Sequence, residues 1–475
     1  MLKKIRFFPY RCFLLIGFIL LFFSHGKLSA QVSRAVYFQE QLPGASVLNP
    51  SFHPHYNVYV NLPLISSFSI GFESPFSYNE LTSEYENGDS LYIDRDEVMN
   101  ALKEKNYFSF ELYNELGRAG FRAGQHFFHF SIAKVFSTKF AFEKDFATLL
   151  LYGNGSDQLI GKQLNFDNTG LNMTSYQQFT LGYSIKIGHK FTVGTSLKYL
   201  NGGFNIWTEK AVFNLYTANE SNYPITASAD ISLHTSSDIS DFDDLIRQVE
   251  QYKWFDLTGN DGFGFDLGVE FEPSNEYKLS ASVVDLGWIK WKENTKSFTS
   301  ENPGTDFTFQ GFDIIDLISD GSISYDSINL FDTLTNNFKL ETSYEPYTSH
   351  LNPKLYVGGL WQLNKSNELG MLIRTDFVEE RVQPSFTINY THRFGKVLSL
   401  YGNYSMLNRS YANVGLGFIL KVWVVQLYLL NDMAFGLVQP ANAKSYNFHF
   451  GMNFLFGTPK EKGINMPTYK STDSQ

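Results

Sequence analysis

The chain has 475 residues, of which 17% are aromatic, with 46 Phe and 28 Tyr, and only 18% are charged. This composition excludes an intrinsically disordered chain, because disordered segments are poor in aromatic residues and rich in charge. The formal net charge of −10 argues against a nucleic-acid partner.

Residues 1–30 have the features of a secretory signal peptide. Basic residues precede an apolar stretch, Cys12–Phe23, and Leu28-Ser29-Ala30 provides a plausible cleavage site. The alternative is a transmembrane anchor, but the apolar stretch is shorter than the about 20 residues that a spanning helix needs. Gln31, and not a cysteine, follows this site, which argues against a lipoprotein. Cys12 is the only cysteine, so the processed chain would hold no disulfide, thiolate metal site or cysteine nucleophile.

Residues 31–56 are expected to form a plug-like segment without regular strands. The stretch Leu42–Pro50 contains two prolines, Pro43 and Pro50, and one glycine, Gly44. These residues interrupt the hydrogen bonding of a strand. We therefore expect the segment to lie inside or under a barrel formed by the rest of the chain. The alternative interpretation is a disordered leader ahead of the first strand.

Alternation of apolar and polar residues predicts strands from residue 57 onward. Val58–Leu62 and Phe68–Phe72 are predicted to be the first two strands. The clearest hairpin runs over Phe179–Tyr199, with apolar residues on one face and glycine, small hydroxyl residues and lysine on the other. Such a polar face suits a hydrated lumen. A soluble sandwich with its polar face outward would also fit one such hairpin, but many segments along the chain repeat the pattern.

Helical spacing is confined to short stretches. Apolar residues at intervals of three and four predict helices at Phe142–Tyr152 and Ser240–Tyr252. A further short helix is predicted at Asp94–Lys105, within a polar and acidic loop. The segment Lys292–Pro346 is rich in Ser, Thr, Asn and Asp, and we expect it to be a long surface loop. Two further short helices are predicted within this loop, at Asp313–Ser319 and Ser327–Asn337.

The last predicted strand, Tyr446–Gly457, carries Tyr, Phe or Met at every second position. Its apolar face covers about the 9–11 residues that a tilted strand needs to cross a bilayer, and only a polar tail, Thr458–Gln475, follows. Only helices and closed barrels satisfy every backbone group in lipid. Residues 57–457 are therefore predicted to form an all-β, transmembrane antiparallel barrel of about 14 strands, with 16 possible. A change in apolar parity at Val283-Val284 predicts one β-bulge in it.

Three stretches, Leu42–Phe52, Tyr183–Tyr199 and Val284–Trp291, together resemble an uncharacterised family of outer-membrane barrel proteins from the Bacteroidota, the domain of unknown function 5723. The resemblance covers essentially the whole processed chain and implies an outer-membrane barrel without an assigned activity. A more distant similarity to fatty-acid-transporter and type IX secretion barrels rests on Asn49-Pro50. In the fatty-acid transporters a comparable segment plugs the lumen. Ser51 stands where their motif usually has alanine, and no lipid-binding residue can be matched.

Charged residues fall on the polar side of several predicted strands, where a barrel would turn them toward its lumen. These candidates for a solute-selective lumen are Lys186, Lys198, Asp230, Asp266, Glu270, Glu368, Arg374 and Asp376. The alternative, which we favour, is that they form interior salt bridges that hold a plugged barrel. Asn49 and Pro50 are the candidate plug motif.

No catalytic, cofactor-binding or metal site is predicted. His53 and His55 flank a proline and have no third ligand nearby in the sequence. His126 and His129 are three residues apart on a predicted strand, so they would lie on opposite faces. The chain has neither a nucleophile-elbow glycine pattern nor the paired histidines of zinc proteases. We therefore expect no enzyme and no cofactor.

The sequence favours the binding or passive passage of a small solute, which could be hydrophobic, through a plugged barrel in the cell outer membrane. The alternative is a non-transporting scaffold that docks a secretion or surface partner. Outer-membrane lipid and, during biogenesis, the barrel-assembly machinery are the other expected partners.

Overall fold

The structure, a computed structural model, describes residues 34–457 except for 63–65, 85–90, 154–155, 158, 168, 221–223, 238–254, 256, 302–303, 305, 310–339, 379–380, 408–409, 435 and 437–438. The predicted signal peptide and polar tail lie outside these residues, as do the helices predicted at Ser240–Tyr252, Asp313–Ser319 and Ser327–Asn337. Within the described part of the chain, no helix combines the length and the apolar character needed to cross a membrane.

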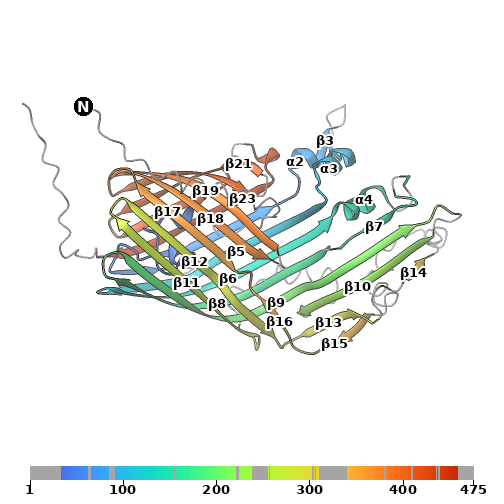
Figure 1. The fold of residues 1–475 in the computed structure, drawn as a ribbon, viewed down its shortest axis with the longest axis horizontal. Helices are drawn as coiled ribbons and strands as arrows, with labels where there is room; N and C mark the ends of the chain where they lie inside the picture. Colours follow the sequence, from blue (N-terminus) through green and yellow to red (C-terminus); the bar gives the residue numbers. More distant parts are fainter. Residues whose placement is uncertain are drawn as a thin grey trace, which may run out of the picture.

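One antiparallel sheet of 21 strand segments closes into a barrel with 14 strand positions (Figure 1). Some positions hold two or three consecutive segments. In order round the barrel they are β1 (Val58–Asn61) with β2 (Ser67–Glu73), β5 (Lys105–Ala123), β6 (His126–Glu143), β8 (Gly170–Ile187), β9 (Phe191–Thr217), β10 (Ile225–Ser236) with β11 (Asp261–Ser274), β12 (Tyr277–Trp291) with β13 (Thr295–Ser300), β15 (Leu340–Ser343) with β16 (Tyr347–His350) and β17 (Lys354–Gln362), β18 (Asn367–Val378), β19 (Arg381–Phe394), β20 (Leu398–Leu407), β21 (Ser410–Val422), β22 (Val425–Asn431) and β23 (Ser445–Phe456).

The last strand closes the barrel, as predicted. β23 pairs with β22 on one side and with both β1 and β2 on the other. The strands predicted at Val58–Leu62 and Phe68–Phe72 are confirmed as β1 and β2. They share one position of the barrel, because both pair with β5 and β23. Pro63 lies between them in the sequence, and proline lacks the N–H that a continuous ladder requires.

The smaller elements lie at the ends of the strands. β7 (Gln163–Asn165) pairs with β9, β14 (Asp306–Phe309) pairs with β10, and β3 (Thr82–Glu84) forms a separate two-stranded sheet with β4 (Leu91–Ile93). The helices are η1 (Arg34–Phe38), η2 (Pro43–Val47), α2 (Tyr78–Leu81), α3 (Arg95–Ala101), α4 (Lys144–Tyr152) and η4 (Pro440–Asn442).

Two of the predicted helices are confirmed, each with a recognisable end. α3 begins after Asp94, whose carboxylate accepts hydrogen bonds from the backbone N–H groups of Asp96 and Glu97. α4 ends at Gly153, which adopts a φ of 75° that favours glycine.

Alternate residues of the barrel strands face opposite sides, as the sequence pattern predicted. Phe130, Leu181, Leu197 and Phe265 lie side by side on four neighbouring strands, and all four side chains are exposed on the outer surface. The residues between them in sequence face the interior, and many are small or polar and buried. The outer surface of the closed part of the barrel is therefore an apolar, partly aromatic band.

The two rims of the barrel differ. At the rim where β1 starts and β23 ends, adjacent strands are joined by short turns, and Gly124 and Gly188 provide left-handed φ angles of 64° and 62° in two of them. We call this end the turn rim. Longer connections, including those that contain α2, α3 and α4, lie at the opposite end, the loop rim.

The barrel wall is much taller on one side. β9 has 27 residues, whereas β22 has 7, and Figure 1 shows β6, β8, β9 and β10 extending well beyond β17–β23 at the loop rim. We call this side the extended wall. The prediction that Lys292–Pro346 is wholly a loop is wrong, because β13, β14 and β15 lie within it and pair with β10 or with each other. A distant strand supplies their hydrogen bonds, so the local sequence did not reveal them.

Candidate functional site: the barrel lumen

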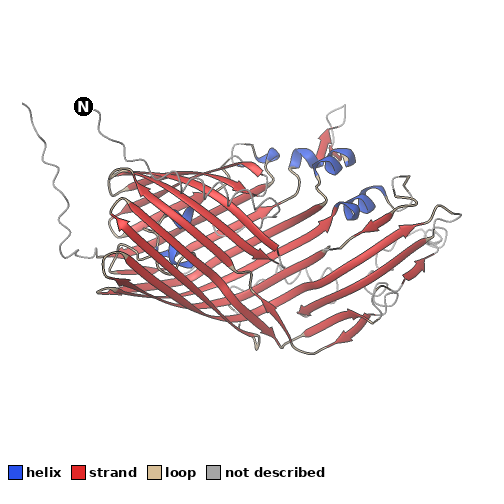
Figure 2. Ribbon diagram, viewed as in Figure 1, coloured by secondary structure: helices blue, strands red, loops and turns tan. Residues whose placement is uncertain are grey.

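Residues 34–56, here called the inner segment, lie inside the barrel toward the turn rim. Figure 2 shows its two short helices, η1 and η2, surrounded by strands. Pro43 occupies the first turn of η2, where the missing N–H of proline costs no hydrogen bond. The prolines and glycine of this stretch thus produce tight turns in place of a strand.

Asp432, which follows β22, holds the start of the inner segment. Its carboxylate accepts hydrogen bonds from the backbone N–H groups of Arg34 at 2.7 Å and Ala35 at 3.2 Å. The Asn403 side chain donates a third bond to the same carboxylate at 2.9 Å. Hydrogen bonds to a charged acceptor are the stronger kind, so Asp432 fixes η1 against the wall.

The Asn49-Pro50 motif fits into a notch between β9 and β11. Gly194 and Gly268 face each other across these strands. A Cβ atom on Gly194 would collide with Pro50, and a Cβ atom on Gly268 would collide with Asn49 and Pro50. The Asn49 side chain accepts hydrogen bonds from the backbone N–H and the hydroxyl of Ser51, at 3.0 and 2.7 Å. Asn49 is completely buried, so the motif is a packed turn against the wall.

Two aromatic residues of η1 use similar notches on β17 and β18, which follow β12 in the same part of the wall. Tyr37 lies over Gly358 and Phe38 over Gly370, where added Cβ atoms would collide with the rings. The Tyr37 ring also stacks on Tyr356 at 5.5 Å, and its hydroxyl is 2.9 Å from that of Ser280. The inward-facing glycines therefore shape the lumen around the inner segment.

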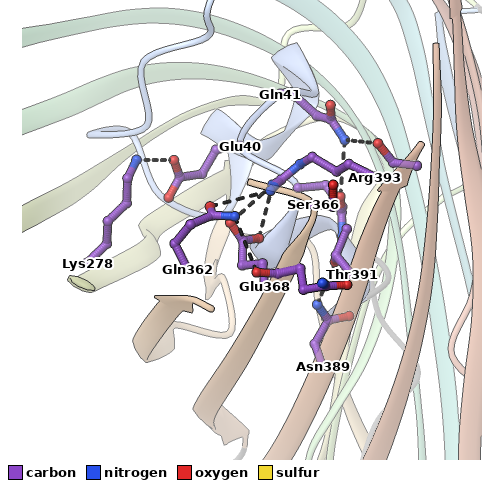
Figure 3. Close-up of polar contacts among 12 residues, drawn as sticks. Glu40, Gln41, Lys278, Gln362, Ser366, Glu368, Asn389, Thr391 and Arg393 are labelled. Carbon is purple, nitrogen blue, oxygen red and sulfur yellow. Dashed lines mark hydrogen bonds and ion pairs between the residues drawn. The ribbon is translucent and has the colours of Figure 1, made fainter. Parts of the chain in front are cut away.

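Polar contacts fix the inner segment near the turn rim (Figure 3). The Lys278 ammonium contacts the Glu40 carboxylate at 2.5 Å, and the Gln41 amide is 3.4 Å from the hydroxyl of Ser399. Burial would raise the pKa of Glu40, but the ammonium of Lys278 outweighs that effect and holds the pKa below its ordinary value. The ion pair is therefore fully formed at neutral pH. Beside it, Arg393 binds both oxygens of Glu368 at 3.1 and 3.2 Å.

A cavity of about 150 Å³ lies between the inner segment and the wall. Val47 and Leu48 of the inner segment contribute to its lining, and the remaining sides come from β2, β5, β6, β8, β9, β12, β16 and β17. Val135 and Ile289 add apolar surface, and Tyr176 adds an aromatic side chain. The cavity therefore has a substantial apolar surface, to which segments from most of the barrel sequence contribute.

A chain of ion pairs forms the charged part of this lining. The Lys198 ammonium lies 2.7 Å from Asp266 and 2.6 Å from Asp285, and Lys354 lies 2.5 Å from the second oxygen of Asp285. Asp285 adopts a left-handed φ of 62° beside a register shift between β11 and β12, and its N–H donates to Asp266 at 2.8 Å. The shift confirms the bulge predicted at Val283-Val284 and turns Asp285 toward Lys198.

The structure brings together two pairs of the predicted lumen residues, Lys198 with Asp266 and Arg374 with Asp376, the latter at 3.0 Å. The others have partners of their own. Glu270 is buried 4.0 Å from Lys278, Glu368 binds Arg393, Lys186 lies 3.7 Å from Glu272, and Asp230 pairs with Lys210. Lys186 and Asp230 are the more exposed members of the set, since Lys186 is near the turn rim and Asp230 is on the extended wall.

Sequence reasoning missed three charged residues of the cavity, Glu111, Asp285 and Lys354. Glu111 lies between the apolar residues Phe110 and Leu112 in the sequence, so its polar parity was a usable signal. Asp285 follows the bulge, where parity changes, and Lys354 is the first residue of β17. The alternation of apolar and polar residues therefore did not predict which face Asp285 or Lys354 occupies.

His126 and His129 both lie on β6 but do not face each other. His126 is exposed beside the Tyr183 hydroxyl, whereas His129 is buried on the opposite face, as predicted. Over the described residues, no group of three or more His, Cys, Asp or Glu side chains is arranged to hold a metal ion.

Residues 50–432 match the model of a protein family described as a family of unknown function, DUF5723. The match spans most of the barrel, from the Asn49-Pro50 turn to the aspartate that holds η1. The chain belongs to this family. No curated protein matches the DUF5723 chain.

Several solved barrels resemble this DUF5723 protein in structure. A deletion mutant of TodX, a monoaromatic hydrocarbon channel, has a TM-score of 0.41 and 10% identity and covers 86% of this chain and 93% of its own. The Ralstonia pickettii toluene transporter TbuX has a TM-score of 0.40 and 9% identity, with coverages of 87% and 93%. A Pseudomonas aeruginosa FadL homologue has a TM-score of 0.41 and 9% identity, with coverages of 91% and 99%. Similarities this low transfer neither substrate nor residue roles.

The glycine notch predicts a specific effect of one methyl group. In Gly268→Ala the new Cβ would overlap Asn49 and Pro50, so the inner segment should shift, at a cost of about 1–3 kcal/mol. Limited proteolysis within the inner segment should become faster. Gly264→Ala is the matched control, since it lies on the same strand and face with ordinary contacts of 3.5–3.7 Å. Equal proteolysis rates for the two variants would contradict the packing described here.

Proposed function

We propose that this protein is an outer-membrane barrel that binds a small solute with an apolar part in the cavity beside the inner segment. The observation that carries the proposal is the cavity of about 150 Å³, lined by Val47 and Leu48 of the inner segment and by Val135 and Ile289 of the wall. An apolar cavity of about 150 Å³ in another protein accommodates benzene. The site therefore suits a solute of that size.

The apolar band on the outside supports the membrane location. Exposed Phe130, Leu181, Leu197 and Phe265 would be costly in water as a continuous patch, but they match the lipid-facing band of outer-membrane barrels. The short-turn and long-connection rims correspond to the periplasmic and external sides of such barrels. In this orientation the inner segment is near the periplasm and the extended wall projects outside the cell.

The inner segment would act as a plug. It is fixed by Asp432, by the Glu40–Lys278 ion pair and by the glycine notches on β9, β11, β17 and β18. A solute bound beside Val47 and Leu48 would touch the plug directly, so plug movement would be required for passage. This favours slow, gated passage of bound solute over an open pore.

Binding can be tested with benzyl alcohol and purified protein in detergent, by equilibrium dialysis against protein-free micelles. Val135→Phe adds a ring that points into the cavity and should reduce binding by at least about tenfold, because it occupies the space that the solute needs. Val357→Phe makes the same change on the exposed outer face and should bind like the unmodified protein. Equal binding by all three proteins would refute the cavity as the site.

A second function, a non-transporting scaffold, is favoured by the extent of the contacts that fix the inner segment, since a firmly held plug needs no solute. Liposome swelling distinguishes the two. Uptake of small apolar solutes that rises in Gly268→Ala relative to Gly264→Ala would support passage past the plug. The absence of uptake in both variants, together with a partner that co-purifies with the barrel, would support the scaffold.

A further inference from the structure

The two lysines that line the cavity are already neutralised. Lys198 contacts Asp266 and Asp285 at 2.7 and 2.6 Å, and Lys354 contacts Asp285 at 2.5 Å. Each ammonium therefore has a carboxylate partner within hydrogen-bonding distance. A carboxylate ligand would have to compete with these aspartates, so the lysines do not form a site for an anionic solute.

Glu111 is different from the other charged residues of the cavity. It faces the lumen from β5 and lines the cavity, yet it has no ion pair or hydrogen bond with any residue that the structure describes. Its strongest charged neighbours are Lys354, Arg374, Glu73 and Asp376. Both basic neighbours are bound to aspartates, Lys354 to Asp285 and Arg374 to Asp376.

The charges around the cavity leave an excess of carboxylates. Among described residues, the Asp, Glu, Lys and Arg side chains that line the cavity or bind its lysines comprise three carboxylates and two ammonium groups. They are Glu111, Asp266 and Asp285, with Lys198 and Lys354. A partly buried carboxyl group without a partner is costly to ionise, and that cost falls when an opposite charge binds beside it. The local field therefore favours a cation.

The remaining lining suits the rest of such a ligand. Leu48, Val135 and Ile289 offer apolar surface, and Tyr176 is an aromatic member of the lining. An ammonium group is attracted to an aromatic face as well as to a carboxylate. The cavity thus combines one uncompensated carboxylate with apolar and aromatic walls.

We propose that the cavity binds a small solute that carries a protonated amine, with Glu111 as its counter-ion and the apolar part of the solute against Leu48, Val135 and Ile289. This inference rests on the proposed function and names the class of solute. Glu111 is then the residue that determines specificity for amines over neutral solutes of the same size.

Benzylamine and benzyl alcohol provide matched probes, since they have similar size and differ in charge at neutral pH. Each is measured by equilibrium dialysis with the purified barrel in detergent, against protein-free micelles. The barrel should bind benzylamine at least about tenfold more tightly, because a hydrogen bond between charged groups is stronger than one between neutral groups. Glu111→Gln should remove this preference and retain the binding of benzyl alcohol. Glu97→Gln, the same change in exposed α3, should keep the preference.

The outcomes separate the two proposals. Binding of benzyl alcohol without a preference for benzylamine overturns the role of Glu111 and leaves the proposed function standing. A preference that persists in Glu111→Gln also overturns it and directs attention to Glu73 or Asp376. If neither probe binds to the unmodified barrel, both proposals fail. Unheated electrophoretic mobility establishes that each variant retains the closed barrel.

Discussion

Deletion of Ser445–Phe456 is expected to abolish barrel formation. The deletion removes β23, which pairs with β22 on one side and with β1 and β2 on the other. The exposed backbone groups of both edges would face lipid, where each unsatisfied group costs several kcal/mol. The edges cannot simply pair, because β22 and β1 run in the same direction once the strand between them is lost. The protein should be missing from the outer-membrane fraction and should lack the compact band of unheated samples in electrophoresis.

The matched control is a truncation after Gly457, which retains every paired residue of β23. This variant should assemble like the full chain in both measurements. Normal membrane insertion of the chain without β23 would contradict the closure of the barrel by this strand.

The second large effect is expected from Phe265→Arg. Phe265 lies in a row with Leu197, Leu181 and Phe130 on the exposed outer face. An arginine at the middle of the lipid-facing band destabilises an outer-membrane barrel by about 2–4 kcal/mol. The free energy of unfolding in lipid vesicles, measured by urea titration, should fall by this amount.

Phe265→Leu is the control, because it keeps an apolar side chain at the same place, and its free energy of unfolding should change much less. An arginine variant that unfolds like the leucine variant would show that this face of the barrel does not contact lipid. That result would also remove the support for a membrane location.

The strands could be predicted well because each carries its own signal. A strand turns alternate side chains to opposite faces, so a short window such as Phe179–Tyr199 or Tyr446–Gly457 reveals both the strand and its apolar side. The same rule placed Lys198 and Asp266 on the inner face. It failed where the pattern stops, as in β13 to β15, because these strands are held by pairing with β10 or with each other.

The amino-acid sequence by itself determined the all-β barrel, the apolar outer face and the absence of regular strands in the inner segment. Only the tertiary structure decided which inward residues meet: the pairing of Asp285 with Lys198 and Lys354, the position of Glu111 at the cavity, and the notch at Gly268 for Asn49. The physical reason is that the face of a residue follows from its position in a strand, whereas its neighbours depend on register. Register is set by bulges, turns and barrel closure, which join residues far apart in the chain.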